Sequence, residues 1–150
     1  MKYHLLQVAH TDKEVDLINA EGHNAVRRHA KICDLQCGGA SQLSDWDGVL
    51  IHDYDHMADI DANDLDEAYA IGQSRDRHIH PEVQMIIDNP EQAKRFHSIS
   101  VGDILINSVT HEVWGVHDYG FINLECDPAD LEGLLWDAEG NMVKINKEVA

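Results

Sequence analysis

The chain has 150 residues, with 28 Asp and Glu against 11 Lys and Arg, so its formal net charge at pH 7 is −17. This surplus repels nucleic acids and anionic membranes, and it therefore excludes direct binding to either polyanion. The chain lacks an apolar run of the roughly 20 residues that cross a bilayer. Charged residues follow the N-terminal apolar stretch by Asp12, so we expect a cytoplasmic protein without a signal peptide. The length suits one domain with a substantial core.

The first third of the chain predicts a strand, a pair of helices and a second strand. Tyr3–Ala9 is rich in apolar β-formers. Residues 15–18 and 23–35 place apolar side chains at helical intervals, and Glu21-Gly22 interrupts them. The short apolar run in Gly48–His52 predicts the second strand.

Short helical segments are predicted between residues 64 and 95. Residues 64–71 have an apolar helical face, which Asp61 or Asn63 can cap. Residues 81–87 begin with proline, which suits the first turn of a helix, and residues 90–95 can begin another turn. We therefore expect this part of the chain to cover a sheet.

An antiparallel hairpin followed by a third short strand is predicted next. Apolar β-formers lie on both sides of Asn107–His111, and Gly102-Asp103 and Tyr119-Gly120 punctuate the ends. Gly tolerates a positive φ and Asp can bond its local backbone, so Gly102-Asp103 can turn the chain into the first strand. The hairpin and its third strand span Ile104–Leu124.

Together these segments predict a single α+β domain in which helices pack on one face of an antiparallel sheet. The sheet is expected to contain Tyr3–Ala9, Gly48–His52 and the Ile104–Leu124 hairpin. Residues 1–125 form this domain, and residues 126–150 form a C-terminal helix and tail packed on it. A small strand is predicted at residues 142–145. The last helix opens at Asp127 or Asp130 and buries Leu131, Leu134, Leu135 and Trp136.

The hairpin also carries a resemblance to a known family. Its segments are His97-Ser98-Ile99-Ser100-Val101-Gly102-Asp103-Ile104-Leu105 and, further along, Asp118-Tyr119-Gly120-Phe121. They resemble the YodL-like domains of phages, plasmids and conjugative elements. With Tyr3–Ala9 as the first strand and Asp64–Ile71 as the helix before the hairpin, the likeness extends over most of residues 1–125. The resemblance implies this fold and a mobile-element setting, and it brings no established activity and no catalytic residues.

The cysteines do not predict a disulfide framework, because Cys33, Cys37 and Cys126 are an odd number. A zinc site commonly takes about four ligands as two close pairs. Cys33 and Cys37 form one such pair, and no obvious second pair accompanies them. We therefore expect reduced structural cysteines and no cofactor.

Two histidine pairs are the alternatives for a metal site. His52 and His56 share one side of the backbone, but in a strand about 13 Å would separate them, so only a bend or helix would let them bind one ion. His78 and His80 occupy alternate positions beside Glu82. Since the chain has 11 histidines, chance pairs are expected. We predict no bound metal, and a metal-dependent enzyme that uses these histidines with an Asp remains an alternative.

Catalysis by a nucleophile is not predicted. His97 and Ser98 are adjacent in a β-forming segment, where neighbouring side chains point to opposite faces. The chain has no Gly-x-Ser-x-Gly turn and no Gly-rich phosphate loop with Lys. No residue is therefore assigned a catalytic role.

The acidic side chains are the remaining functional feature. No Lys or Arg lies between Lys31 and Arg75, and carboxylates can stand where phosphates recur along a duplex. Together with the mobile-element setting, this predicts a non-enzymatic nucleic-acid mimic that binds and inhibits a basic host protein or a nucleic-acid-binding complex, such as restriction or CRISPR machinery. An acidic structural or assembly protein, including a homo-oligomer, is the other alternative. The predicted contact residues are Asp53, Asp55, Asp59, Asp61, Asp64, Asp66 and Glu67.

Overall fold

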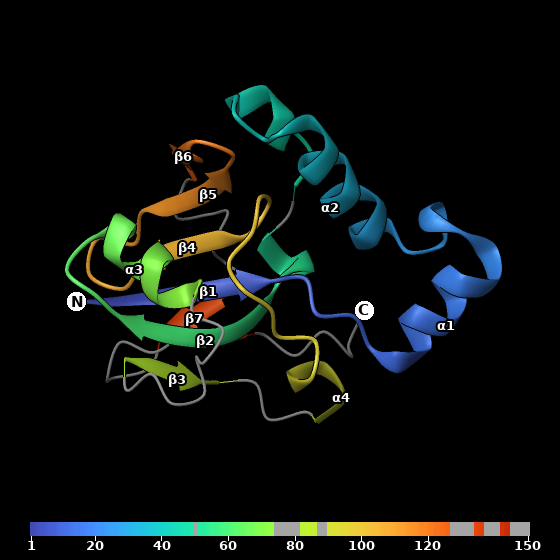
Figure 1. The fold of residues 1–150 in the computed structure, drawn as a ribbon, viewed down its shortest axis with the longest axis horizontal. Coiled ribbons are helices and arrows are strands. Elements are labelled where there is room, and N and C mark those ends of the chain that lie inside the picture. The colour runs from blue at the N-terminus through green and yellow to red at the C-terminus, as the bar shows by residue number, and fades with distance from the viewer. Residues whose placement is uncertain (50, 74–81, 87–89, 127–133, 137–141, 145–150) are drawn as a thin grey trace.

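The structure is a computed structural model that describes residues 1–49, 51–73, 82–86, 90–126, 134–136 and 142–144. Six strands form the main sheet in the order β3-β2-β1-β4-β5-β6, and every neighbouring pair is antiparallel. β1 lies inside the sheet, between β2 and β4 (Figure 1). The strands are β1 (Lys2–Gln7), β2 (Asp55–Asp61), β3 (Val83–Met85), β4 (Ile104–Asn107), β5 (Val113–His117) and β6 (Gly120–Asn123).

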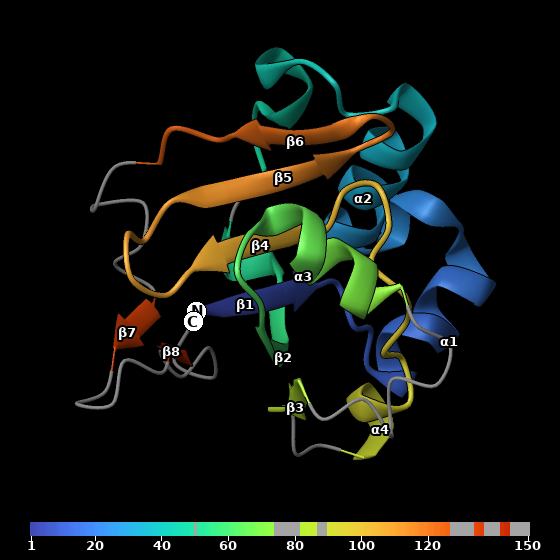
Figure 2. The same cartoon turned by 60° about the vertical axis from the view of Figure 1, so that its left-hand side comes forward.

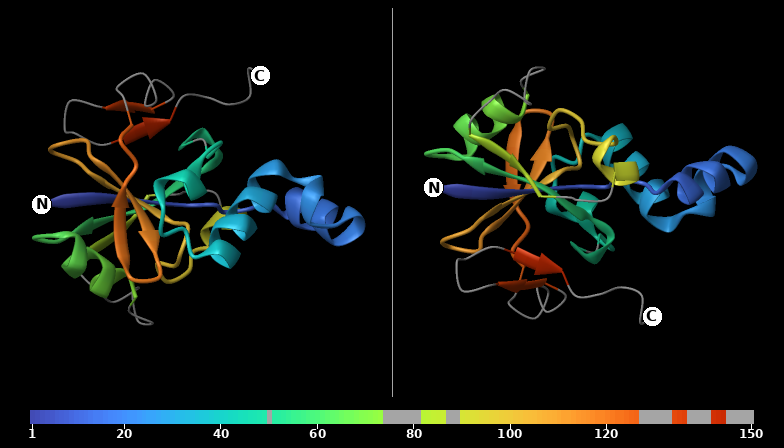
Figure 3. Two further views of the ribbon diagram at one scale, coloured as in Figure 1. Left: turned by 90° about the horizontal axis from the view of Figure 1, so that it is seen from above. Right: turned by 90° about the horizontal axis from the view of Figure 1, so that it is seen from below.

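The helices α1 and α2 project beyond one end of the sheet, and the N-terminus lies at the other end (Figure 3). None of the helices in the described part of the chain has both the length and the apolar character needed to cross a bilayer. The described helices are α1 (Asp12–Glu21), α2 (Arg27–Gly38), α3 (Leu65–Gly72) and α4 (Pro90–Ala93), with the 3-10 turns η1 (His23–Ala25), η2 (Leu43–Trp46) and η3 (Ile51–Asp53).

Helices cover both faces of the sheet. Side chains alternate along each strand, so neighbouring residues of one strand contribute to opposite faces. In β4, Leu105 belongs to one core cluster together with Ile71 of α3. Its neighbour Ile104 belongs to the opposite cluster, together with Leu35 of α2. The predicted α+β class is thus confirmed, whereas the expected packing of all helices on one face is not: α3 and α2 lie on opposite sides of the sheet (Figure 2).

The predicted hairpin is confirmed. β4 pairs with β5 from Ile104–Gly115 to Ile106–Val113, and β5 pairs in turn with β6. Gly102 has a φ of +95°, a conformation that glycine adopts readily. A Cβ at this position would lie 2.6 Å from the Ile32 side chain, so the turn also needs glycine for the close approach of α2.

The helical pair before the second strand also forms as predicted. Thr11 accepts a hydrogen bond from the Glu14 backbone N–H, and the Glu14 side chain accepts one from the Thr11 N–H, so α1 begins with a capping box. Gly22, with a φ of 96°, follows the last residue of α1. The chain can therefore reverse through η1 into α2.

The second strand begins farther along the chain than predicted. The sequence predicts a strand at Gly48–His52, whereas Ile51–Asp53 forms η3 and the strand is β2. Asp is a poor β-former, yet β2 contains Asp at both ends and in its interior. Pairing with β1 and β3 provides its backbone hydrogen bonds, and this tertiary pairing overrides the local preference.

Two predicted helices contain strands instead. Within residues 81–87, Val83–Met85 forms β3 and pairs with β2. The expected helix through Leu134, Leu135 and Trp136 is wrong, because Leu134–Trp136 forms β7 and pairs with β8 (Met142–Lys144). The small strand predicted at residues 142–145 is thus confirmed as β8. Such short strands depend on a partner that no local pattern reveals. Much of the tail 126–150 lies outside the described residues.

Candidate functional site

The end of the sheet that holds the N-terminus brings three segments together. The backbone N–H of Ala62 donates to the Met1 carbonyl over 2.8 Å, and the N–H of Ser108 donates to the Lys2 carbonyl over 3.0 Å. The start of β1, the β2–α3 loop and the β4–β5 turn therefore lie side by side at this end (Figure 1). Acidic residues that are far apart in the chain can act together here.

Four carboxylates, which we call the carboxylate patch, are exposed at this end: Asp61, Asp64, Asp66 and Glu67. Asp61 is the last residue of β2, and its side chain is 77% exposed. Asp64 caps α3, in place of the predicted Asp61 or Asn63, because its carboxylate accepts the Glu67 backbone N–H over 2.8 Å. These four of the predicted contact residues face solvent.

Among the described residues, the Met1 amino group is the one cation that forms an ion pair with the carboxylate patch. In the part of the chain that the structure describes, no Lys or Arg side chain forms an ion pair with its members. The Met1 amino group lies 3.1 Å from Asp61 Oδ1. Burial, together with the charges of Asp64 and Glu112, raises the pKa of the Tyr3 hydroxyl against a smaller opposing effect of Asn107. The negative field at this end thus includes Glu112 of the β4–β5 turn.

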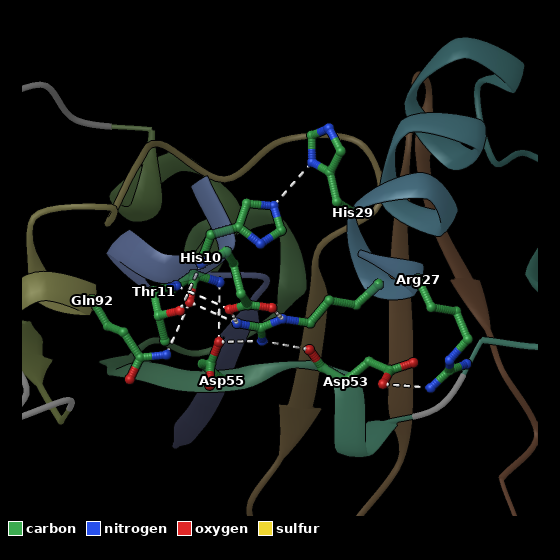
Figure 4. A network of polar contacts seen from close by, with 10 residues as sticks. His10, Thr11, Arg27, His29, Asp53, Asp55 and Gln92 are labelled. Carbon is green, nitrogen blue, oxygen red and sulfur yellow. Dashed lines mark hydrogen bonds and ion pairs between the residues drawn. The ribbon is translucent and has the colours of Figure 1, made fainter. Parts of the chain in front are cut away.

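Asp53 and Asp55 lie at the opposite end of the sheet and are paired with arginines of α2. Arg27 Nη2 donates to Asp53 Oδ1 over 2.7 Å, and Arg28 Nη1 donates to Asp55 Oδ2 over 2.8 Å. Figure 4 shows Asp53 facing Arg27, with Asp55 beside it in the same polar network. Their charges are consumed within the fold, so they are poorer contact residues than the carboxylate patch.

Arg28 joins this network to α1. Its Nε and Nη2 atoms bind both carboxylate oxygens of Glu14, at 2.9 Å and 2.5 Å. Burial raises the pKa of Glu14, but the hydrogen bonds from Arg28 and the Thr11 backbone outweigh it and hold that pKa at about 2. Arg28 also donates to the carbonyl of Ala9, and Gln92 donates to the same oxygen (Figure 4). The charges of Glu14, Asp53 and Asp55 are thus neutralised within the fold.

Asp59 is buried and lies between two histidines. Its Oδ1 accepts hydrogen bonds from His4 Nδ1 over 2.6 Å and from His56 Nε2 over 2.7 Å. Burial raises the pKa of Asp59, but the two imidazoles together hold it well below its usual range. The carboxylate is 3% exposed, so Asp59 is not available to a partner at the surface.

Each predicted metal pair includes a side chain outside the described part of the chain, so both pairs stay predictions. His56 contacts His4 and Asp59, and the side chain of His52 lies outside the described part, as do His78 and His80. The three groups that meet at Asp59 could bind an ion, but their side chains are 0%, 4% and 3% exposed, which leaves a substrate no access. His4 was not among the predicted ligands, because its contact with Asp59 spans 55 residues.

A second group of possible metal ligands lies near the opposite end of the sheet and consists of His23, His29 and Cys33. Burial and the neighbouring His23 lower the pKa of His29. Burial, with Cys37 and Asp34, raises the pKa of the Cys33 thiol. The four-residue spacing of His29 and Cys33 was readable from the sequence, but the approach of His23 was not.

Comparison with protein-family models, with curated proteins and with solved structures finds no match to this chain in any of the three. The resemblance of the hairpin to YodL-like domains stays a prediction.

Proposed function

We propose that this protein is a non-enzymatic, acidic inhibitor of phage or mobile-element type, acting in the cytoplasm of a host cell. It binds a basic host protein whose own ligand is nucleic acid, such as a restriction or CRISPR nuclease complex, and it occupies the surface that the nucleic acid would take. The carboxylate patch is the contact surface, and Glu112 of the β4–β5 turn adds to its charge.

The observation that supports this function is the exposure of the four carboxylates without compensating Lys or Arg side chains among the described residues. Asp64, Asp66 and Glu67 lie at the beginning of α3, within one turn of each other. A helix rises about 1.5 Å per residue, so these three charges lie within about 5 Å along the helix axis. A nucleic-acid strand carries one phosphate per about 3.4 Å, so the charge per unit length at the start of α3 is comparable to that of nucleic acid.

The charge of the whole chain strengthens the proposal. A net charge of −17 attracts a basic partner, over a range that shortens as the salt concentration rises. This attraction speeds the encounter and makes binding salt-dependent. The same charge repels nucleic acid, so the protein would compete with nucleic acid for the partner without binding it.

The experiment is a capture assay with two variants of equal net charge. The patch variant carries Asp61→Asn, Asp64→Asn, Asp66→Asn and Glu67→Gln. The control variant removes four exposed acids elsewhere in the chain: Asp16→Asn, Glu21→Gln, Asp34→Asn and Asp47→Asn. Each immobilised protein is exposed to nuclease-treated host lysate, and the bound proteins are eluted by rising salt. The DNA binding of the captured protein is then titrated with each variant.

The original protein and the control variant are expected to capture the same basic protein at low salt and to displace its DNA. The patch variant is expected to lose both effects by at least about tenfold, equivalent to about 1.4 kcal/mol. Equal capture by the patch variant would reject the contact surface. A captured protein whose DNA binding is unaffected would reject inhibition by mimicry, and a defined homo-oligomer without another partner would favour an assembly role.

A further inference from the structure

We propose that His23, His29 and Cys33 bind a Zn²⁺ ion where η1 meets α2. One ligand atom from each side chain lies within 4.8 Å of the other two. None of the three residues is a member of the carboxylate patch, and none of them is a hydrogen-bond partner of Arg28. The site would therefore add a metal-binding property that is independent of partner recognition.

The local backbone explains why these three side chains converge. His29 and Cys33 are four residues apart in α2, so they lie one turn apart on the same face, and His29 Nε2 is 3.6 Å from Cys33 Sγ. Gly22 reverses the chain after α1, and η1 then places His23 Nδ1 3.0 Å from the same Nε2 atom of His29. Two ligands come from one helix, and the third comes from the turn that precedes it.

These separations are close to those of a tetrahedral zinc site. With Zn–N bonds of about 2.0 Å and a Zn–S bond of about 2.3 Å, tetrahedral angles place two nitrogens about 3.3 Å apart and a nitrogen about 3.5 Å from sulfur. The two distances at His29 Nε2 are 3.0 Å to nitrogen and 3.6 Å to sulfur. Two imidazoles and a thiolate favour zinc over Mg²⁺ or Ca²⁺, which prefer oxygen ligands.

His10 provides the outer contact that a metal-binding histidine usually has. His10 Nε2 lies 3.0 Å from His29 Nδ1, on the side of the ring away from His23 and Cys33 (Figure 4 shows the His10–His29 pair). With Nε2 of His29 on the metal, its Nδ1–H donates to His10 and fixes the tautomer and the orientation of the ring. The arrangement thus contains both the ligands and a support for one of them.

Three protein ligands leave one coordination position, which water can fill because His23 is exposed. On binding, the Cys33 thiol releases its proton and the thiolate forms the bond to zinc. The ion would then connect η1 to α2 and stabilise the folded protein, because the unfolded chain does not hold these groups together.

The test uses the untagged full chain after treatment with a chelator. Zn²⁺ binding is measured by calorimetry, and Co²⁺ serves as the spectroscopic probe, because a tetrahedral Co²⁺ ion bound to thiolate shows a charge-transfer band in the near ultraviolet. This band distinguishes the proposed site from the buried group of His4, His56 and Asp59, which has no sulfur. The variants are Cys33→Ser and His29→Gln, with Cys37→Ser as the matched thiol control.

We expect one Zn²⁺ or Co²⁺ per chain, a thiolate band that is lost in Cys33→Ser and retained in Cys37→Ser, and a Tm that rises with Zn²⁺ only where the band is retained. His10→Gln is expected to keep the band but to weaken affinity by about 10–100-fold. Circular dichroism of each metal-free variant checks its fold. Absence of stoichiometric binding would overturn the proposal, as would binding without the thiolate band or a band that depends on Cys37.

Discussion

Arg28 connects four separate segments of the chain through a single side chain. It binds Glu14 of α1 with two nitrogens, Asp55 of β2 with a third bond, and the backbone carbonyls of Ala9 and Asp53. The Arg28 side chain is 13% exposed, so its charge needs these partners. A Lys at this position would keep the charge but would lack the planar fork that binds both oxygens of Glu14.

Gly115 of β5 is packed tightly against the Trp46 ring. A Cβ on Gly115 would lie 2.4 Å from Trp46 Cζ2, and the Trp46 ring is held by the hydrogen bond from its Nε1 to the Ala40 carbonyl. Gly115→Ala is therefore expected to destabilise the protein by about 1–3 kcal/mol, because the ring cannot move away without losing its contacts. Urea denaturation measures the change.

Gly38→Ala is the matched control for this substitution. Gly38 ends α2, and a Cβ there meets nothing within 4 Å. The substitution should leave stability unchanged or raise it by up to about 1 kcal/mol, because Ala favours the helix over Gly. Equal effects of Gly38→Ala and Gly115→Ala would show that contact with Trp46 does not constrain the strand.

At the scale of elements, α3 combines a structural and a proposed recognition role. Its apolar residues Ala68 and Ile71 pack on the sheet, while its first turn presents Asp66 and Glu67 to solvent. Acidic side chains at a helix N-terminus are stabilised by the helix dipole. The fold therefore tolerates like charges here that would repel each other elsewhere.

The cap of α3 allows recognition to be separated from stability. Asp64→Ala removes the acceptor of the Glu67 N–H and is expected to destabilise the protein by about 1 kcal/mol, whereas Asp64→Asn keeps an acceptor and should cost only a few tenths. Thermal denaturation of the two variants measures this difference. If both variants lost the same stability, charge at the helix end would matter more than the cap.

At the scale of the whole molecule, negative charge is divided unequally between the two ends of the sheet. At the end that carries α1 and α2, Glu14, Asp53 and Asp55 are paired with Arg27 and Arg28. The other end leaves Asp61, Asp66 and their neighbours exposed to solvent. The predicted contact acids that have no Lys or Arg partner among the described residues thus lie at the N-terminal end of β1, which would orient a basic partner toward that end.

The buried Asp103 and the half-buried Glu14 predict opposite effects of pH on stability. Burial raises the pKa of Asp103 to about 6 against the opposing effects of His97, Ser100 and Gln7. Its folded pKa exceeds its unfolded value of 3.8, so its contribution to stability is full below that value and falls as pH rises through about 6. Glu14, with a folded pKa of about 2 against an unfolded 4.5, contributes above 4.5 and loses its contribution as pH falls toward 2.

Denaturation as a function of pH separates the two groups. Asp103→Asn is expected to remove part of the decline in stability between pH 4 and 6, and Glu14→Gln is expected to remove part of the acid-side loss below pH 4.5. The difference between each variant and the original protein, taken across the pH range, is the measurement. A constant difference between Asp103→Asn and the original protein from pH 4 to 6 would contradict the raised pKa.

Local patterns in the sequence were sufficient to predict the elements that depend on residues near them in the chain. The helical pair around Gly22, the helix of residues 64–71 and the Ile104–Leu124 hairpin follow from periodicity and turn residues. The exposure of Asp64, Asp66 and Glu67 follows as well, because acids at a helix start face water unless a distant cation reaches them.

Only the tertiary structure decided what happens to the other predicted contact acids. Asp53 and Asp55 meet arginines 26 and 27 residues away, and Asp59 meets His4 across 55 residues, so no local pattern could show that their charges are consumed. The same holds for β2 and β3, whose backbone bonds come from neighbouring strands, and for the approach of His23 to α2. Composition and periodicity determined the class of the fold and the sign of its field, whereas long-range pairing determined which charges remain at the surface, because the sequence does not specify which distant side chains meet.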